Sequence, residues 1–450
     1  MSRAVEPSPV VANLLRSDAR VCVPAGGYNG RGSEPRCPYG RSVGKESPDT
    51  ECRSPAADRS FMPDIGLYVH VPFCPRKCGY CDFYSTVPAG DECERLTVAL
   101  LVELERAFTA RSDLRVETIF VGGGTPTFLP ISALDRLLAR LGQIAVEHRA
   151  TEFTVEANPG SLGRDRASVL RANGVNRVSM GAQSFNEAEL AVLDRVHSPA
   201  DIAAGAEVVH GAGFEHFNLD LIFGIPGQTP ATWRESLQRA IGLGPDHLAC
   251  YGLTFEPGTP LHDRLMQGRL LRVAEETEAE LYTAGVAELG AAGFEHYEIS
   301  NFAWPGCRCR HNLRYWHNLP VLGVGPAAAS YLDGRRWRNL PDTAEYLRRV
   351  TAAEPVAVDE ERLSPAERAG ETAMLMLRLV EGIGCEEFRA LTGFDAEQLF
   401  AEAVARHAGS GRLIVERGRI RLTDEGRLMA DSVVLDFLSP VPRSRDDGRP

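Results

Sequence analysis

From residue 65 onward the chain alternates between short strand patterns and amphipathic helical patterns, and this alternation limits the fold more than any other feature. Six runs rich in apolar and β-branched residues end near glycine or proline turns and are followed by helical periodicity. The predicted strands are IGLYVHV (65–71), ETIFVGG (117–123), EFTVEA (152–157), RVSMGA (177–182), FNLDLIFG (217–224) and HLACYGLT (247–254). A repeated unit of strand, crossover helix and parallel strand builds a (β/α) barrel or an open parallel sheet. Functional side chains then gather at the carboxyl ends of the strands.

The remainder of the chain differs in composition from this alternating region. Residues before it are rich in Ser, Pro and Gly, and Cys22, Cys37 and Cys52 lie far apart there, which favours unliganded thiols over a zinc site. We expect a disordered N-terminal tail (1–60), a core barrel (61–265), an extension of helices with a few scattered strands (266–358), a small helical domain (359–440) and a disordered C-terminal tail (441–450). Within the small domain, a strand–turn–strand at 413–423 followed by one helix at 424–438 resembles a winged helix.

Composition excludes several functional classes. The net charge of −12 argues against a nucleic-acid partner, because phosphate binding requires a basic surface. No apolar run approaches the ~18 residues that span a bilayer, and the N-terminus lacks the pattern of a signal peptide. We therefore expect a cytoplasmic protein. The eleven cysteines of so long a chain do not suggest a disulfide framework.

Three cysteines lie close together immediately after the first predicted strand. Cys74, Cys78 and Cys81 form Cys-x3-Cys-x2-Cys in HVPFCPRKCGYCDF. Four irons of a [4Fe-4S] cluster normally take four thiolates, so three clustered thiolates leave one iron open to another ligand. A zinc knuckle is the alternative, but zinc would require a fourth close ligand, and the next cysteine, Cys93, begins a predicted helix.

Further motifs follow at the ends of the successive predicted strands. They are YVHVPFC (68–74), GGGTPT (122–127), VEANPG (154–159), GAQSF (181–185), LDRVH (193–197) and NLDLIFGIPGQT (218–229). On these motifs the chain resembles the radical S-adenosylmethionine (SAM) superfamily, and within it the oxygen-independent coproporphyrinogen III oxidase-like family, over about residues 62–440.

The resemblance implies an α/β fold: a partial (β/α)6 TIM-like barrel with a C-terminal helical, winged-helix-like extension. It also implies that Cys74, Cys78 and Cys81 hold a [4Fe-4S] cluster whose open iron binds SAM. The positions that match the family's SAM contacts are Tyr68, Tyr80, Gly123, Gly124, Thr125, Glu156, Gln183, Arg195 and Asp220.

Two features favour the heme chaperone (HemW) branch of this family. Phe83 occupies the position where coproporphyrinogen dehydrogenases have an additional cysteine, and HNLRYW (311–316) resembles the heme-linked HNxxYW motif of the branch. Imidazole is a usual axial ligand of heme iron and aromatic rings cover porphyrin faces, although the motif could instead be a structural cap around a buried tryptophan. The candidate heme-binding residues are His311, Asn312, Tyr315 and Trp316. Ala329 stands where the family has a histidine, which weakens the heme assignment.

The resemblance therefore implies a heme chaperone that transfers heme to an acceptor protein, whose identity and membrane association the sequence leaves open, and that receives electrons from a donor protein. One alternative is an oxygen-independent coproporphyrinogen III dehydrogenase. The other is a radical SAM enzyme whose substrate is not a tetrapyrrole. The sequence gives no indication of the oligomeric state.

Overall fold

The computed structural model of the chain describes residues 64–438. The two predicted tails, with Cys22, Cys37 and Cys52, lie outside the described residues.

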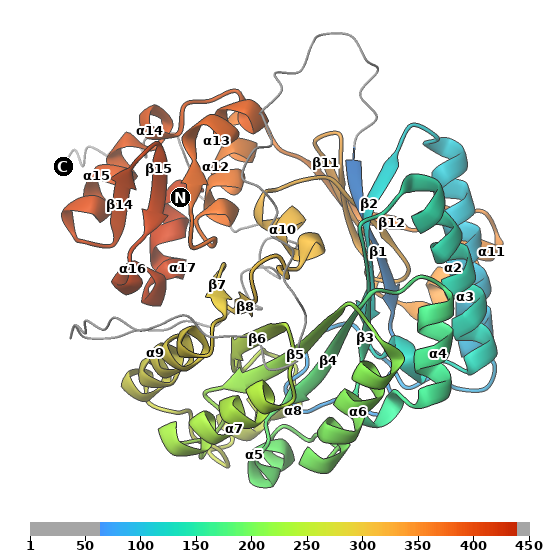
Figure 1. Ribbon diagram of the computed structural model, residues 1–450. Coiled ribbons are helices and arrows are strands. Elements are labelled where there is room, and N and C mark those ends of the chain that lie inside the picture. The colour runs from blue at the N-terminus through green and yellow to red at the C-terminus, as the bar shows by residue number, and fades with distance from the viewer. Residues whose placement is uncertain (1–63, 439–450) are drawn as a thin grey trace.

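A single twelve-stranded sheet organises the molecule, in the order β12-β11-β10-β9-β1-β2-β3-β4-β5-β6-β8-β7 (Figure 1). Its parallel centre consists of the six predicted strands: β1 (Asp64–Val71), β2 (Arg115–Gly123), β3 (Glu152–Ala157), β4 (Arg177–Gln183), β5 (His216–Phe223) and β6 (His247–Gly252). Each lies within two residues of its predicted bounds. The α/β class and the partial barrel are therefore confirmed.

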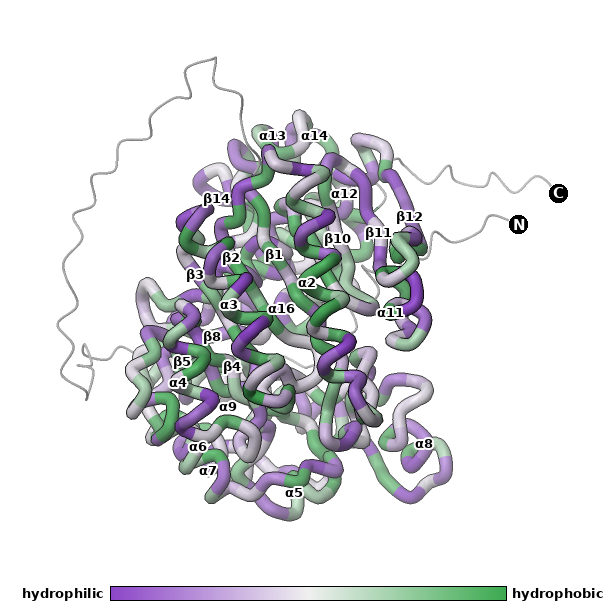
Figure 2. The backbone as a smooth tube through the Cα atoms, turned by 90° about the vertical axis from the view of Figure 1, so that its right-hand side faces the viewer, coloured by the Kyte–Doolittle hydropathy of each residue, from purple (hydrophilic) through white to green (hydrophobic). Residues whose placement is uncertain are grey.

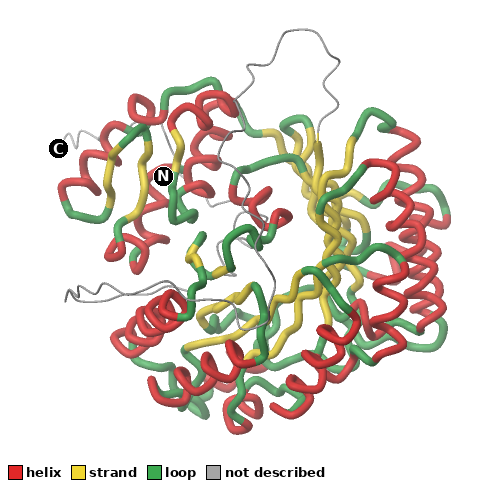
Figure 3. Tube along the Cα trace, in the orientation of Figure 1, coloured by secondary structure: helices red, strands yellow, loops and turns green. Residues whose placement is uncertain are grey.

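Helices cover the convex outer face of this sheet, while the strands form a curved inner wall (Figure 3). They are α2 (Glu92–Ala110), α3 (Ile131–His148), α4 (Arg164–Ala172), α5 (Glu187–Val192), α6 (Pro199–Ala212), α7 (Pro230–Gly242) and α9 (Glu275–Ala291), with 3-10 turns at Pro126–Phe128 and Pro159–Ser161. Helix α8 (Pro260–Met266) instead lies beside the loop after β1, where Leu261 N–H donates to the Gly79 carbonyl at 2.8 Å. In α3, residues Leu134, Leu137, Leu138 and Leu141 are fully buried at helical spacing. Figure 2 shows the resulting mixture of hydrophobic and hydrophilic residues along α2 and α3.

The inner face of the parallel strands is polar. Outward-facing side chains such as Val155 and Val178 are buried in the core beneath the helices. Their neighbours Thr154, Glu156 and Ser179 instead line the space inside the barrel. A parallel strand covered by apolar layers on both faces would be continuously hydrophobic. The alternation therefore gives the barrel a polar lumen.

Residues after α9 extend the sheet at both edges. The added strands are β7 (Glu295–His296), β8 (Asn301–Ala303), β9 (Val321–Val324), β10 (Ala329–Leu332), β11 (Arg335–Asn339) and β12 (Ala357–Arg362), accompanied by α10 (Arg310–Trp316) and α11 (Thr343–Thr351). Strand β9 pairs in parallel with β1, whereas β10 to β12 continue antiparallel. The expectation of helices with a few scattered strands underestimated the strands of this segment, because strands of two to six residues carry little periodicity of their own.

A second hydrophobic core lies in the C-terminal unit. Its elements are α12 (Pro365–Met376), β13 (Ile383–Gly384), α13 (Cys385–Thr392), α14 (Ala396–Leu399), α15 (Ala401–Gly409), β14 (Leu413–Glu416), β15 (Arg419–Leu422), α16 (Asp424–Leu428), α17 (Ala430–Val434) and a 3-10 turn at Leu435–Phe437. The predicted strand–turn–strand is present as β14 and β15.

The single helix predicted at 424–438 is wrong, because the chain breaks at Met429 (φ −112°, ψ 20°). Gly426 packs so closely on Arg412 that an added Cβ would lie 2.0 Å from its carbonyl oxygen. The break lets the following turn direct Val433 and Phe437 into the second core.

Within residues 64–438, no helix combines the length and the apolar character needed to cross a membrane.

Candidate functional site

The three motif cysteines lie in the loop between β1 and α2. The backbone anchors this loop at its start, because Cys74 N–H donates to the Thr86 carbonyl at 3.0 Å. Cys74 Sγ lies 3.6 Å from the Thr125 hydroxyl, which belongs to the glycine motif. The Arg195 guanidinium donates from Nη1 to Cys78 Sγ at 3.3 Å. A cation beside the thiols stabilises negative charge on sulfur.

The spacing of these cysteines does not suit a single metal ion. Among the described side chains, the His, Cys, Asp and Glu group of three whose ligand atoms lie within 4.8 Å of one another is His216, Asp246 and Cys307, not the motif cysteines. Burial raises the pKa of Cys74, and it raises that of Cys81 to about 12. Such thiols remain protonated at neutral pH unless a metal displaces the proton. This donor set fits a cluster that offers each thiolate its own iron.

The glycine motif at the end of β2 is packed tightly against the cysteine loop. Gly123 has φ +103°, and a Cβ there would lie 2.4 Å from the His70 ring. At Gly124 a Cβ would lie 2.7 Å from the Phe73 carbonyl oxygen. Gly123 N–H also donates to Glu156 Oε2 at 2.9 Å. Glycine is therefore required at both positions by contacts within the protein itself.

Glu156 and Asp220 are two carboxyl groups enclosed at the same end of the lumen. Burial, with a smaller contribution from Asp220, raises the pKa of Glu156 to about 8. Burial raises the pKa of Asp220 to about 6, although hydrogen bonds from Asn218 and Ser179 oppose the shift. Both groups face the cavity without a salt-bridge partner among the described residues. A cationic ligand would restore their charged forms, so these residues fit SAM, which carries a sulfonium and an ammonium group.

Gln183 and Arg195 complete this end of the lumen. Gln183 adopts the left-handed conformation (φ +66°) at an irregularity between β4 and β5, which is a conformation that costs energy for a residue other than glycine. Arg195 donates from Nη2 to Asn158 Oδ1 at 2.7 Å and to the Gly181 carbonyl at 2.8 Å. The protein's own contacts therefore hold the Arg195 side chain beside the cysteine loop.

A cavity of about 820 Å³ runs through the lumen from the cysteine loop to α10. Its size lies within the range of pockets that bind large organic ligands, ~300–1,000 Å³. The predicted site residues that line it are Tyr68, Tyr80, Cys81, Glu156, Gln183, Asp220, Asn312, Tyr315 and Trp316. Phe83 is on its lining with 64% of its surface exposed, and Ala329 also contributes to the wall. The structure thus joins the two predicted regions in one space.

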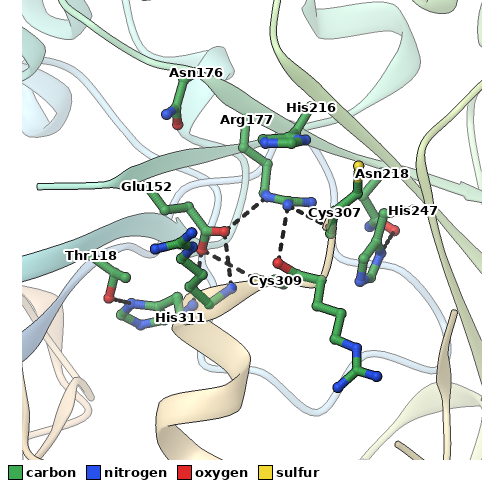
Figure 4. A network of polar contacts seen from close by, with 12 residues as sticks. Thr118, Glu152, Asn176, Arg177, His216, Asn218, His247, Cys307, Cys309 and His311 are labelled. Atoms are coloured by element: carbon green, nitrogen blue, oxygen red, sulfur yellow. Dashed lines mark hydrogen bonds and ion pairs between the residues drawn. The ribbon is translucent and has the colours of Figure 1, made fainter. Parts of the chain in front are cut away.

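Helix α10, which carries the HNLRYW motif, is held by a carboxylate more than 150 residues earlier in the chain (Figure 4). Glu152 accepts hydrogen bonds from the backbone N–H groups of Arg310 at 3.0 Å and His311 at 2.9 Å, so it caps the helix N-terminus. Arg177 binds Glu152 through Nε at 3.1 Å and donates from Nη2 to the Cys307 carbonyl at 2.8 Å. This network positions the motif against the barrel.

The structure does not bring His311 into the cavity. The side chain is 1% exposed, and Nδ1 lies 2.9 Å from the Thr118 hydroxyl while Nε2 lies 3.3 Å from Tyr315 OH. Its ring stacks on Phe120 with centroids 5.2 Å apart, and burial lowers its pKa to about 3. The neutral imidazole therefore supports Tyr315 and Phe120 from behind the cavity wall. An axial-ligand role for His311 stays a prediction, and it would require the ring to leave both partners.

Several residues of the site were not identified from the sequence. His70 donates from Nε2 to the Tyr84 carbonyl at 2.9 Å and accepts from Tyr68 OH at 3.0 Å, directly beneath Gly123. Thr154 and Arg177 line the lumen between the two predicted regions. Their signal is the alternation of polar and apolar residues in EFTVEA and RVSMGA, which places every second residue on the inner face.

Comparison with known proteins agrees with this geometry. Residues 68–240 match the Radical SAM superfamily, and residues 363–429 match the HemN C-terminal domain. The heme chaperone HemW of Mycobacterium tuberculosis is 38% identical over 377 residues, which cover 83% of this chain and 95% of that protein. The chain belongs to the HemW family of radical SAM proteins.

Two further comparisons agree with the assignment of this HemW-family chain. The Escherichia coli heme chaperone HemW is 34% identical over 84% of this chain and 99% of its own length. The coproporphyrinogen III oxidase HemN of Escherichia coli, a radical SAM enzyme, superposes with a TM-score of 0.73 at 23% identity, covering 85% of this chain and 92% of that one. The latter comparison shows the shared fold. Membership of the radical SAM superfamily implies a [4Fe-4S] cluster and SAM, and the thiols and enclosed carboxyl groups fit both.

Proposed function

We propose that this protein is a heme chaperone that holds heme in its lumen and transfers it to an acceptor protein, with a [4Fe-4S] cluster and SAM bound at the neighbouring strand ends. The observation that carries the proposal is the continuous cavity between the cysteine loop and the HNLRYW helix. The likeness to HemW heme chaperones over most of both chains supports it. The acceptor and the electron donor are proteins whose identity neither observation specifies.

In this proposal the cluster and SAM occupy the end of the lumen where the cysteine loop meets the strands. Cys74, Cys78 and Cys81 ligate three irons. Glu156 and Asp220 provide negative charge for the cationic groups of SAM. Arg195 lies beside Cys78 and provides a hydrogen-bond donor for the carboxylate of SAM. Tyr68, Tyr80 and Gln183 form the surrounding wall, and Gly123, Gly124 and Thr125 pack against the start of the cysteine loop. Bound SAM and cluster together would supply one-electron chemistry.

Heme occupies the other end of the lumen in this proposal. Tyr315 and Trp316 from α10 present aromatic surface to the cavity, and Asn312 adds an amide group. Flat aromatic side chains suit the face of a porphyrin. His311 contributes by positioning Tyr315 rather than by entering the cavity.

The competing function, oxygen-independent decarboxylation of coproporphyrinogen III, shares the fold. Phe83 argues against it on this chain, because an exposed phenyl ring lies on the cavity lining at the position of the dehydrogenase cysteine. A thiol at this position would be available for proton or hydrogen transfer, whereas a phenyl ring is not.

The test is to titrate anaerobically loaded protein with heme, and separately to assay coproporphyrinogen III turnover with SAM and a reductant. We expect heme binding at low-micromolar affinity or tighter, which corresponds to at least ~8 kcal/mol, and no decarboxylation. Turnover of coproporphyrinogen, or no binding of heme by the wild-type protein, would contradict the proposal.

One variant and its control test what His311 of the HNLRYW motif contributes. His311→Ala should weaken heme binding without shifting the Soret band if His311 positions Tyr315, whereas a shifted band would identify it as the axial ligand. His148→Ala on the outer helix α3 is the matched control and should leave both properties unchanged.

A further inference from the structure

Six buried polar atoms of residues that line the cavity have no hydrogen-bond partner among the described residues: Thr154 Oγ1, Arg177 Nη1, Asn301 Oδ1, Trp316 Nε1, Tyr331 OH and Arg338 Nε. Two of them, Arg177 Nη1 and Thr154 Oγ1, belong to neighbouring parallel strands. The side chains of Arg177 and Thr154 are 2% and 1% exposed, and both line the cavity. A buried donor without an acceptor typically costs ~1–3 kcal/mol, so such atoms call for a partner that binds from the cavity.

The two side chains are direct neighbours in the sheet. Thr154 on β3 is in register with Arg177 on β4, and both point to the inner face. The other nitrogens of Arg177 are already occupied, since Nε binds Glu152 and Nη2 binds the Cys307 carbonyl (Figure 4). The guanidinium is therefore held rigidly with Nη1 left over, next to a hydroxyl group that can also donate.

The hydrogen bonding of Arg177 leaves one donor for an acceptor group at this position. Glu152 divides its carboxylate between Arg177 and the N-terminus of α10, so it does not satisfy the guanidinium completely. Among the other cations on the cavity lining, Arg336 binds Glu371 and Glu361, Arg338 binds Asp359, and Lys77 is exposed. Arg177 is thus the most deeply buried of these cations, and its Nη1 has no partner among the described residues.

Apolar and aromatic side chains line the same cavity. They are Phe120, Tyr315, Trp316, Leu319 and Val321. A flat, largely apolar ligand with a carboxylate on one edge would contact both the polar and the apolar parts of this lining.

We propose that Arg177 Nη1 and Thr154 Oγ1 together bind a carboxylate of the lumen ligand, namely a propionate side chain of a tetrapyrrole. The inference rests on the proposed function, which it deepens by stating which part of heme the barrel recognises. The Glu156 and Asp220 end of the lumen, with its two carboxyl groups, is unsuited to the same group. The propionate edge therefore lies against β3 and β4.

The test compares heme with heme dimethyl ester, in which both carboxylates are masked, on the full chain with its cluster loaded. Wild-type protein should bind the ester at least about tenfold more weakly, because hydrogen bonds to a charged group are lost. Thr154→Val removes the hydroxyl while keeping the shape, and it should weaken heme binding several-fold while leaving ester binding unchanged. Arg177→Lys should weaken heme binding by more than ester binding, and it should weaken ester binding as well because it also removes the contacts to Glu152 and the Cys307 carbonyl.

Thr97→Val, a buried substitution on α2 away from the lumen, is the control and should change neither affinity. Cluster loading and circular dichroism identify any variant that has failed to fold, and Thr154→Val keeps the test valid if Arg177→Lys does not fold. Equal binding of heme and its ester by wild-type protein would overturn the inference while leaving heme binding intact. Variants that weaken both ligands equally would also overturn it. Failure of wild-type protein to bind heme would overturn the proposed function and this inference together.

Discussion

The residues with the most perturbed chemistry lie at the strand ends next to the cysteine loop. Glu156 and Asp220 are buried without a salt-bridge partner among the described residues, so burial makes each hold its proton to higher pH than a free carboxyl group. Burial disfavours the ionised form of each carboxyl group, and a bound cation stabilises that form. Recognition of a cationic ligand at this site is therefore coupled to proton release.

This coupling predicts a pH dependence of SAM binding. Glu156 is protonated below its pKa of about 8, and a cationic ligand favours the carboxylate, so affinity should rise with pH up to about 8 and level off above it. The slope below that pH should approach about tenfold per pH unit, with one proton released per SAM bound. Calorimetry in buffers of different ionisation enthalpy measures the proton count.

Glu156→Gln should bind SAM more weakly and without this pH dependence. Glu278→Gln is the matched control, since burial also raises the pKa of Glu278, to about 7, but its side chain does not line the cavity. A wild-type affinity that is flat between pH 6 and ~8 would contradict the assignment of Glu156.

At the residue scale, residues that belong to short sequence motifs could be recognised as site candidates. Residues outside such motifs were missed. The cysteines and glycines stand in a spacing that serves one kind of chemistry, so they could be predicted. Thr154 and Arg177 are each ordinary in sequence, and their importance arises only because sheet register places them side by side. His311 belongs to a motif that suggests a position inside the cavity. Its side chain lies behind the cavity wall instead, because Thr118 and Tyr315 hold it there.

At the scale of elements, the short helix α10 depends on a distant carboxylate. A helix of this length has little stability of its own and leaves its first N–H groups unsatisfied. Glu152 satisfies two of them and is itself held by the buried Arg177. Strands β3 and β4 thereby determine where the HNLRYW residues lie.

Replacing Glu152 with Ala should destabilise the protein by ~3–5 kcal/mol, because it leaves the Arg177 charge buried and unpaired. Hydrogen exchange should show loss of protection in α10, and urea unfolding should show a lower midpoint. Asp342→Ala, which removes the local cap of α11, is the comparison and should cost only ~1 kcal/mol. Equal effects of the two substitutions would show that Glu152 acts as an ordinary local cap.

The difference between local pattern and long-range contact explains which elements could be predicted from the sequence. The six parallel strands and helices α2 and α3 are long and periodic, so local pattern was sufficient. Strands β9 to β12 are short, and what makes them strands is their pairing with β1 and with one another. The break at Met429 was missed because the apolar residues of 424–438 keep a helical spacing across it, so local periodicity does not record the break.

At the scale of the whole molecule, two hydrophobic cores are joined across a polar contact. Arg336 on β11 binds Glu371 on α12 through two hydrogen bonds of 2.6 Å, and both side chains are buried. Asn318, at the end of the α10 segment, donates to Glu371 at 3.1 Å and to Thr372 at 3.0 Å. The C-terminal unit is therefore attached to the sheet extension next to the cavity wall.

Glu371→Ala should loosen this attachment. The buried Arg336 would lose its bidentate partner, which we expect to cost ~3–5 kcal/mol. Hydrogen exchange should increase in β11 and α12 more than in β1 to β6. Glu360→Ala, which removes an exposed pair with Arg335 nearby, should change stability by no more than ~1 kcal/mol. Unchanged exchange in α12 would show that apolar packing alone holds the C-terminal unit.

The pairing of β9 with β1 has a consequence for the order in which the protein is made. Strand β1 emerges from the ribosome first, but the strand that covers its second edge is about 250 residues later in the chain. At ~5–20 residues per second, this edge stays open for roughly 10 to 50 s of synthesis. An open strand edge is a template for pairing with other chains. The nascent barrel thus passes through an interval of exposure that ends only when Val321–Val324 arrives.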